Sequence, residues 1–214
     1  MNLDDFRVHR VCSVHEPAFA QLLRIYTDAL PESERKSTER LSAMMSDPQY
    51  FFLVATMAND VAGFSIVRVF AHADAALLEY MAVASELRNR GVGRWLFAQT
   101  AEFDGICPRF LLAEVDSDKL PSDDEEDRSR RKAFYRRMGC REVDQLCYVM
   151  PPVSTAPPPE MDILVYKQPL PPFLDRSHLR QWLERCYVEV YGLYEDDFRI
   201  EIMMRGLPAH VPLI

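Results

Sequence analysis

The chain has 214 residues, of which 48% are hydrophobic and 27% are charged. This size and apolar content suffice for one substantial core, or for a core with a small appendage. Acidic residues outnumber Lys and Arg by 33 to 25, giving a formal net charge of −8. Nucleic-acid binding depends on clustered basic residues, so we expect no nucleic-acid partner and favour cationic partners or substrates.

No apolar run approaches the ~18–20 residues that span a bilayer, and the acidic start Met1–Asp5 lacks an export signal. We therefore expect a cytoplasmic protein with no membrane association. The cysteines are odd in number, scattered and without a Cys-x-x-Cys pair, so we expect no disulfide framework. The histidines form no ligand-spaced cluster with them, and we expect no metal site. The cysteines are Cys12, Cys107, Cys140, Cys147 and Cys186.

Two helices are predicted before the first strands. In residues 17–30 the apolar side chains recur at helical spacing, and Pro17 suits a first helical turn. A charged connector, residues 31–37, separates this helix from a second, shorter one through Leu41, Met44 and Met45.

Three strands follow. Residues 51–55 and 61–70 are apolar runs separated by the turn residues Asn59-Asp60, which predicts a β-hairpin. Residues 77–83 predict a third strand.

The stretch Arg88-Asn89-Arg90-Gly91-Val92-Gly93 lies between that strand and a segment whose apolar residues recur at helical spacing through Phe103. Glycines let backbone amides approach a ligand, and the first turn of a helix has unpaired N–H donors at its positive dipole end. The stretch therefore predicts an anion site, although its sequence pattern matches neither the Rossmann motif nor the P-loop motif. The alternative is that Gly91 only ends a loop and that Arg88 and Arg90 are solvated.

Residues 110–115 predict another strand. The acidic run Pro121–Asp127 has no apolar periodicity, which predicts a solvated loop or, alternatively, a charged fence that attracts a cationic substrate. Residues 129–138 predict a helix with Gly139 as its C-cap, and residues 142–150 are strand-like.

Two of these motifs resemble those of the GNAT N-acetyltransferase superfamily. The Arg-x-x-Gly-x-Gly spacing after a strand ending in Ala-Val is similar to the family's acyl-coenzyme A pyrophosphate loop. Phe134-Tyr135-x-x-x-Gly139 is similar to the segment whose tyrosine lies next to the sulfur of coenzyme A. The motifs occur in the family's order, about forty residues apart, and the resemblance covers roughly residues 5–170. The chain departs from the family at Arg128 and Arg131, where Asn and Ala are common, and at Cys140, which replaces an aromatic residue.

The resemblance implies an α/β GNAT fold with a mixed, mostly antiparallel central sheet flanked by helices, and it makes residues 161–166 the last sheet strand. Residues 151–159 are too rich in proline for a helix or a central strand and predict an extended connector. We expect residues 1–170 to form the acetyltransferase domain and residues 171–214 a C-terminal helical extension, packed on the flank of the domain or at a dimer contact. A helix is predicted through Leu179–Val190 with Asp175 as N-cap. Residues 193–214 give no pattern that we can interpret.

The resemblance further implies that acetyl-CoA is the acyl donor and that the chain is an N-acetyltransferase without a metal. Tyr135 is the candidate general acid for the departing thiolate, and the alternative is that it only packs against coenzyme A. The expected coenzyme A-binding residues are Met81, Ala82, Val83, Arg88, Asn89, Arg90, Gly91, Val92, Gly93 and Tyr135.

An amine must lose a proton before it can attack a thioester, so carboxylates are candidate bases. Alternation along the strand places Glu79 on the face of Met81 and Val83, and we rank it first. Glu114 ranks second, because a carboxylate in an apolar strand needs a partner. Glu34 ranks third: with Glu32 it resembles an acidic pair that some arylalkylamine-acetylating members carry, although a solvated loop explains the pair equally.

The acceptor is expected to be a primary amine, either a small cationic amine or a protein lysine. A coenzyme A-binding regulatory module without turnover, or a protein-interaction domain that keeps only the fold, remains the alternative. We expect a monomer or a homodimer.

Overall fold

The computed structural model describes residues 2–119, 125–152 and 159–214. Most of the proline-rich connector, at 153–158, and residues 120–124, which include the start of the acidic run, lie outside the described residues. The chain divides into two compact units. The N-terminal unit comprises Met1–Val69 and Leu78–Cys107, and the C-terminal unit comprises Phe70–Leu77 and Pro108–Ile214.

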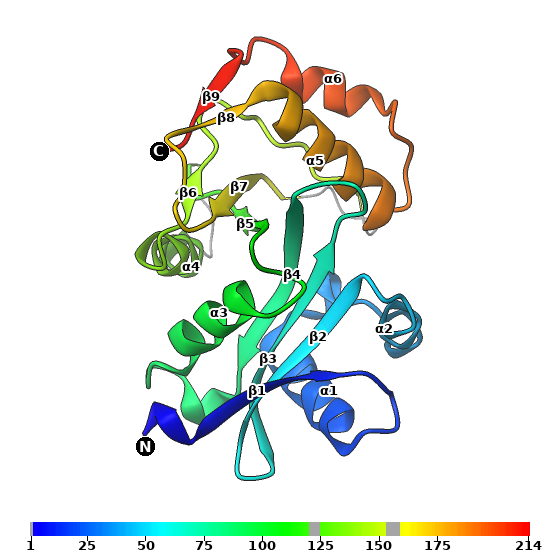
Figure 1. Cartoon of the computed structure of the whole chain (residues 1–214), viewed down its shortest axis with the longest axis vertical. Coiled ribbons are helices and arrows are strands. Elements are labelled where there is room, and N and C mark those ends of the chain that lie inside the picture. The colour runs from blue at the N-terminus through cyan, green and yellow to red at the C-terminus, as the bar shows by residue number, and fades with distance from the viewer. Residues whose placement is uncertain (1, 120–124, 153–158) are drawn as a thin grey trace. The chain divides into compact units, whose positions relative to one another are not determined.

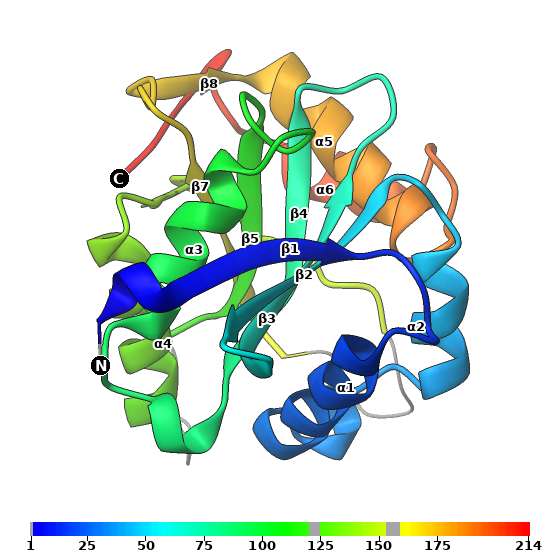
Figure 2. The ribbon, with the colours of Figure 1, turned by 60° about the horizontal axis from the view of Figure 1, so that its bottom comes forward.

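The N-terminal unit is built on antiparallel strands. β1 pairs with β2, and β2 pairs with β3 in the hairpin that the sequence predicts. β1 is the edge strand and lies nearest the viewer in Figure 2. The unit's strands are β1 (Phe6–Val11), β2 (Tyr50–Met57), β3 (Asp60–Val69) and the greater part of β4 (Ala75–Val83); its α-helices are α1 (Pro17–Ala29), α2 (Thr38–Met45) and α3 (Val92–Glu102); its 3-10 turns are η1 (Leu3–Asp5), η2 (Glu32–Glu34) and η3 (Ser85–Leu87).

Helices cover both faces of β2 and β3 (Figure 1). Successive side chains of a strand point to opposite faces. Phe64 and Ile66 of β3 accordingly pack in one buried cluster with α1 and α2. The intervening Ser65 shares a hydrogen bond of 2.7 Å with Thr100 of α3. The predicted helices of this unit are thus confirmed, and each packs its apolar face on the sheet.

The C-terminal unit has a second buried core, centred on α5. Trp182 and Leu179 of α5 are fully buried and cluster with Phe110 of β5 and Ile163 of β7. The indole N–H of Trp182 donates to Asp74 at 3.0 Å. The unit's elements are β5 (Phe110–Asp116), α4 (Glu125–Arg137), β6 (Arg141–Glu142), β7 (Met161–Tyr166), β8 (Phe173–Asp175), α5 (Arg176–Glu189), α6 (Phe198–Met204) and β9 (His210–Pro212), together with the start of β4.

Within the described residues the strands form one seven-stranded sheet, in the order β1-β2-β3-β4-β5-β7-β6, and a small β8-β9 pair. β5 and β6 both run antiparallel to β7. The predicted α/β class, with a mostly antiparallel sheet flanked by helices, is confirmed.

Three local predictions need correction. α4 begins at Glu125, so the last three residues of the acidic run form the first turn of a helix, where negative charge is favourable. The strand expected at 142–150 shrinks to Arg141–Glu142, because the chain turns at Gln145, which has a left-handed φ of 60°. Asp175 does precede α5, but its side chain does not cap the helix and instead meets His210 at 3.0 Å.

Candidate functional site

The predicted anion site is an exposed turn at the start of α3. Gly91 has a φ of 88° and Asn89 a φ of 60°, both in the left-handed region. A glycine adopts this conformation without a steric penalty. Gly91 is the N-cap of α3 and has no side chain with which to bond the first-turn amides, while Val92 is buried and anchors the helix. The first-turn N–H groups, including that of Gly93, therefore suit an anion.

The two arginines of this turn differ in their contacts. Arg88 donates from Nε to the Val83 carbonyl at 3.3 Å, which ties it to the end of β4. Arg90 is exposed. Met81, Ala82 and Val83, which the resemblance assigns to the pantetheine arm, are half-buried at the end of β4.

Glu79, the first-ranked base, lies in a group that we call the Glu79 cluster, which consists of Lys36, Tyr50, Glu79 and Tyr80. The Glu79 side chain is 4% exposed and forms an ion pair through Oε2 with the ammonium of Lys36. That ammonium also lies 5.3 Å from the centroid of the Tyr80 ring, within the range of a cation–π contact. A carboxylate and an aromatic ring therefore hold one cation.

The connector that carries Lys36 is fixed by tyrosines. The Lys36 backbone N–H donates to the Tyr26 hydroxyl at 2.7 Å. The Tyr26 ring packs edge-on against Tyr80, with centroids 5.1 Å apart. The Tyr80 hydroxyl donates to the Glu34 carbonyl at 3.2 Å. Glu34 thus fixes the connector through its main chain, and its side chain is exposed in the short η2 turn.

Two polar atoms of the Glu79 cluster are buried without a hydrogen-bond partner among the described residues. They are Oε1 of Glu79 and the hydroxyl of Tyr50. Burial, next the negative charge of Glu79, and a side-chain interaction with the Glu79 carboxylate raise the pKa of Tyr50 above its ordinary value, so this phenol stays protonated. The Tyr50 hydroxyl therefore lies near Glu79, although neither this hydroxyl nor Oε1 of Glu79 makes a hydrogen bond of normal geometry to a described residue. Buried polar atoms that lack partners are uncommon in folded proteins, and each has a cause such as strain, a catalytic role or a bound water or ligand.

Glu114, the second-ranked base, belongs to the C-terminal unit and is extensively hydrogen-bonded. The Tyr148 hydroxyl donates to its Oε1, and the Tyr191 hydroxyl donates to its Oε2 at 2.7 Å. The Cys186 thiol lies 3.7 Å from Oε1. A partly buried carboxylate with these donors is well satisfied, which favours a structural role within the core.

Tyr135, the candidate acid, lies in the last turns of α4. Gly139, with a φ of 93°, ends the helix as predicted, and the Cys140 N–H bonds back to the Tyr135 carbonyl at 3.1 Å. Burial raises the pKa of Tyr135 to about 12. The phenol is therefore protonated at neutral pH.

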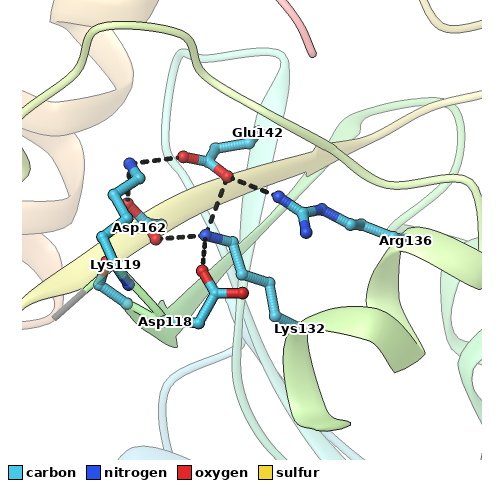
Figure 3. Close-up of polar contacts among 7 residues, drawn as sticks. Asp118, Lys119, Lys132, Arg136, Glu142 and Asp162 are labelled. Atoms are coloured by element: carbon cyan, nitrogen blue, oxygen red, sulfur yellow. Dashed lines mark hydrogen bonds and ion pairs between the residues drawn. The ribbon is translucent and has the colours of Figure 1, made fainter. Parts of the chain in front are cut away.

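A buried charge network holds α4 in place (Figure 3). The Lys132 side chain is 1% exposed, and its Nζ lies 2.7 Å from Asp118, 2.6 Å from Asp162 and 2.9 Å from Glu142. We call these residues, with Lys119 and Arg136, the Lys132 cluster. Lys119 bridges Glu142 and Asp162 at 2.7 and 2.8 Å, and Arg136 reaches Glu142 at 3.1 Å.

The Lys132 cluster ties α4 to β6 and β7 within the C-terminal unit. Although burial acts to lower it, hydrogen bonds to the carboxylates raise the pKa of Lys132, and the lysines hold the pKa of Asp162 below its ordinary value. Sequence reasoning missed this cluster. Its one signal was Asp162, a carboxylate inside an otherwise apolar strand, which requires a partner when it is buried.

Among residues 2–119, 125–152 and 159–214, no group of three or more His, Cys, Asp or Glu side chains could hold a metal ion. Within the same ranges, no helix combines the length and the hydropathy needed to cross a bilayer.

Comparison with known proteins identifies the family of this segment. Residues 48–142 match the model of the acetyltransferase (GNAT) domain. The matched segment includes the Gly91 turn, Glu79, Glu114 and Tyr135, so the family recognised from two motifs is confirmed, without a subfamily. No curated protein matches the sequence.

Solved structures show the GNAT fold as well. A GNAT-family protein from Bacteroides thetaiotaomicron, described as an acetyltransferase, superposes with a TM-score of 0.70 at 20% identity, covering 87% of this chain and 99% of the other. The ribosomal-protein-S18-alanine N-acetyltransferase of Escherichia coli gives 0.54 at 19% identity, covering 75% and 92%. A GNAT acetyltransferase of Elizabethkingia anophelis with acetyl-CoA bound gives 0.52 at 14% identity, covering 77% and 99%.

Proposed function

We propose that the protein transfers an acetyl group from acetyl-CoA to a primary amine. The observation that carries this proposal is the exposed, left-handed Gly91 turn at the start of α3, inside a segment that matches the GNAT acetyltransferase domain. Such a turn suits a pyrophosphate. The Elizabethkingia neighbour, which has acetyl-CoA bound, supports the choice of donor. The Escherichia coli neighbour is named for acetylation of an alanine amine, which supports an amine acceptor.

We assign the base to Glu79. An alkylammonium has a pKa near ~10.4 in water and must lose a proton before it can attack the thioester that acetyl-CoA supplies. Glu79 is the candidate carboxylate already in contact with an ammonium group. Glu114 is held by several donors, and the Glu34 side chain is exposed.

Tyr135 is assigned to the departing thiolate. A simple thiol has a pKa of ~8.5, more than three units below the value of about 12 for Tyr135. Full proton transfer from this phenol to a thiolate is therefore uphill. We propose that Tyr135 donates a hydrogen bond to the thiolate as it forms and does not give up its proton completely.

We further propose that residues 171–214 extend the acetyltransferase domain of residues 1–170 and pack on its flank. The burial of Trp182 and Leu179 of α5 with residues of β5 and β7 supports this assignment over a dimer contact.

The test of the activity is a screen for release of free coenzyme A thiol from acetyl-CoA. The amine panel includes polyamines, arylalkylamines, aminoglycosides, amino acids and lysine peptides. We expect at least one amine to raise thiol release above the rate without acceptor. Tight acetyl-CoA binding with no release for any amine would support the binding-module alternative and would contradict the proposed enzyme.

The donor site has its own test by calorimetry. Gly91→Val places a branched side chain where φ is 88°, which is strained, and it crowds the first-turn amides. We expect acetyl-CoA affinity to fall by about tenfold or more, because a left-handed conformation alone costs about 1–2 kcal/mol. Arg90→Ala removes only an exposed charge and should have a smaller effect. The reverse order would contradict backbone recognition of the pyrophosphate.

A further inference from the structure

The Glu79 cluster has the chemistry of an ammonium-binding site. The carboxylate of Glu79 contacts the Lys36 Nζ, and the Tyr80 ring lies 5.3 Å from the same atom. Charge-assisted hydrogen bonds to a carboxylate and contact with an aromatic face are the two means by which proteins hold alkylammonium groups. At present the bound ammonium belongs to the chain itself.

Lys36 does not use the full capacity of this cluster. An ammonium has three N–H donors. Yet Glu79 Oε1 and the Tyr50 hydroxyl have no hydrogen-bond partner in the described part of the chain, although Glu79 and Tyr50 are each only 4% exposed. The nearby cation Arg68 is neutralised by an ion pair with Asp47, so it does not oppose a second ammonium strongly.

The two partners of the ion pair differ in their access to water. The Lys36 side chain is 23% exposed, whereas Glu79 is 4% exposed. A lysine can swing its charged end into solvent at little cost, because its stem is long and mobile. Glu79 has no such freedom. Because Lys36 can move into water and Glu79 cannot, another ammonium group can replace that of Lys36 at the Glu79 carboxylate.

We propose that the Glu79 cluster binds the ammonium group of the acceptor and that Lys36 occupies this site as a tethered substitute, which the acceptor must displace. The Lys36 ammonium, at the end of an unbranched alkyl chain, lies 5.3 Å from the centroid of the Tyr80 ring, so the matching ligand is a primary ammonium on an unbranched alkyl chain, such as a lysine side chain or an aliphatic polyamine. This inference rests on the proposed acetyltransferase function for the identity of the ligand as acceptor. It identifies Lys36 as a competitor of the substrate.

Chemical rescue tests the site without acetyl-CoA. Lys36→Ala removes a fragment equivalent to n-propylammonium. We expect n-propylammonium at about ten times its dissociation constant to raise the thermal unfolding midpoint of Lys36→Ala by about 3 °C or more. The double variant Lys36→Ala/Glu79→Gln should not respond. The wild type and the control Arg180→Ala, which breaks an exposed ion pair with Glu201, keep the tethered competitor and should respond less than Lys36→Ala. tert-Butylammonium at equal ionic strength should have no effect on any variant.

If Lys36→Ala does not fold, Lys36→Met keeps the apolar stem and lacks only the charged end, so its affinity for methylammonium is measured by calorimetry against Lys36→Met/Glu79→Gln. The proposal would be overturned if the single Lys36 variant showed no response to the linear amine. It would also be overturned if that variant responded equally to the linear amine and to tert-butylammonium, or if the double variant with Glu79→Gln responded equally.

Kinetics provide the second measurement. With Lys36→Met, the KM for spermidine and for Nα-acetyl-lysine amide should fall about tenfold, because the competitor is gone, while the KM for tryptamine changes less. The two linear amines distinguish a polyamine acceptor from a lysine side chain. An unchanged KM for both linear amines would contradict displacement of Lys36. Failure of the proposed enzyme would be seen separately, as absence of thiol release from the wild type with every amine, because rescue of Lys36→Ala does not depend on turnover.

Discussion

Lys132 and Lys36 each place an ammonium group against a buried carboxylate, and the two sites differ in how fully their polar atoms are hydrogen-bonded. Lys132, in the C-terminal unit, is 1% exposed and is surrounded by Asp118, Glu142 and Asp162. Lys36, in the N-terminal unit, is 23% exposed and meets the carboxylate of Glu79, whose Oε1 has no hydrogen-bond partner in the described residues. The first ammonium is fully satisfied, whereas the second leaves part of its partner unused.

The difference separates a structural role from a binding role. A buried polar network in which every member is satisfied fixes the elements that it connects, here α4 with β6 and β7. A buried carboxylate with an unused oxygen retains capacity to bind another donor. Substitution in the Lys132 cluster should therefore change stability, and substitution in the Glu79 cluster should change activity.

The largest expected effect is on stability, from Lys132→Met. Removing one partner of a buried ion pair leaves uncompensated charge, which costs about 3–5 kcal/mol. Denaturant unfolding should show this loss. The matched control is Arg130→Met, which breaks an exposed pair with Asp127 and should cost no more than about 1 kcal/mol. Equal losses in the two variants would remove the distinction between a complete buried network and a surface pair.

Glu79→Gln should lower kcat strongly and change stability little, which is the reverse of the effect expected for Lys132→Met. Loss of a general base lowers kcat by about 10²–10⁴. The free energy of unfolding should change by about 1 kcal/mol or less, because glutamine keeps the shape of the side chain and the partly exposed Lys36 can reach water. Steady-state thiol release and denaturant unfolding on the same preparation measure both quantities. A stability loss as large as that of Lys132→Met, with kcat retained, would make the Glu79 cluster structural.

Tyr135→Phe tests whether Tyr135 of α4 acts through its hydroxyl group or only through the packing of its ring. The phenylalanine keeps the ring and the packing of the helix but lacks the hydroxyl donor. We expect kcat to fall by about 10², at the lower end of the range for acid catalysis, with the KM for acetyl-CoA and the stability nearly unchanged. A wild-type kcat would mean that Tyr135 only packs against coenzyme A.

The sequence predicted most elements of the fold because local patterns determine them. The alternation in β2 and β3 and the helical spacing in α1 and α5 each report one buried face. The failures lie where distant residues decide the structure. β6 ends after Glu142, and the polypeptide beyond it makes isolated bridges from Val143 to Leu213 and from Tyr148 to Met161. β9 forms only by pairing with β8, so no local pattern at 193–214 could indicate it.

The candidate site was predictable only where short local motifs determine it. The Gly91 turn and Tyr135 belong to short motifs, and both were predicted from the resemblance of these motifs to those of the GNAT superfamily. Lys36 and Tyr50 are separated from Glu79 by 43 and 29 positions, and neither has a motif of its own. The Lys132 cluster collects charges from residues 118 to 162, so only the folded chain shows that they meet.

Acid titration gives the smallest expected effect and sharpens the role of the Lys132 cluster. Burial acts to raise the pKa of Asp162, but hydrogen bonds from Lys119 and Lys132 hold it below its ordinary value, and the pKa of Asp118 is also lowered. An unfolded aspartate has a pKa of ~3.9 and binds a proton before the folded one does. The stabilisation is therefore present above about pH 4 and is lost as the pH falls below that value. Asp162→Asn removes one such group, so the difference in unfolding free energy between pH 6 and pH 3 should shrink by up to about 1 kcal/mol, because pH 3 lies about one unit below the pKa of an unfolded aspartate. This difference is independent of the lower stability of the variant at neutral pH, because both measurements use the same protein. An unchanged difference would mean that Asp162 gains no electrostatic stabilisation from the two lysines, and the contrast with the Glu79 cluster would then rest on Lys132 alone.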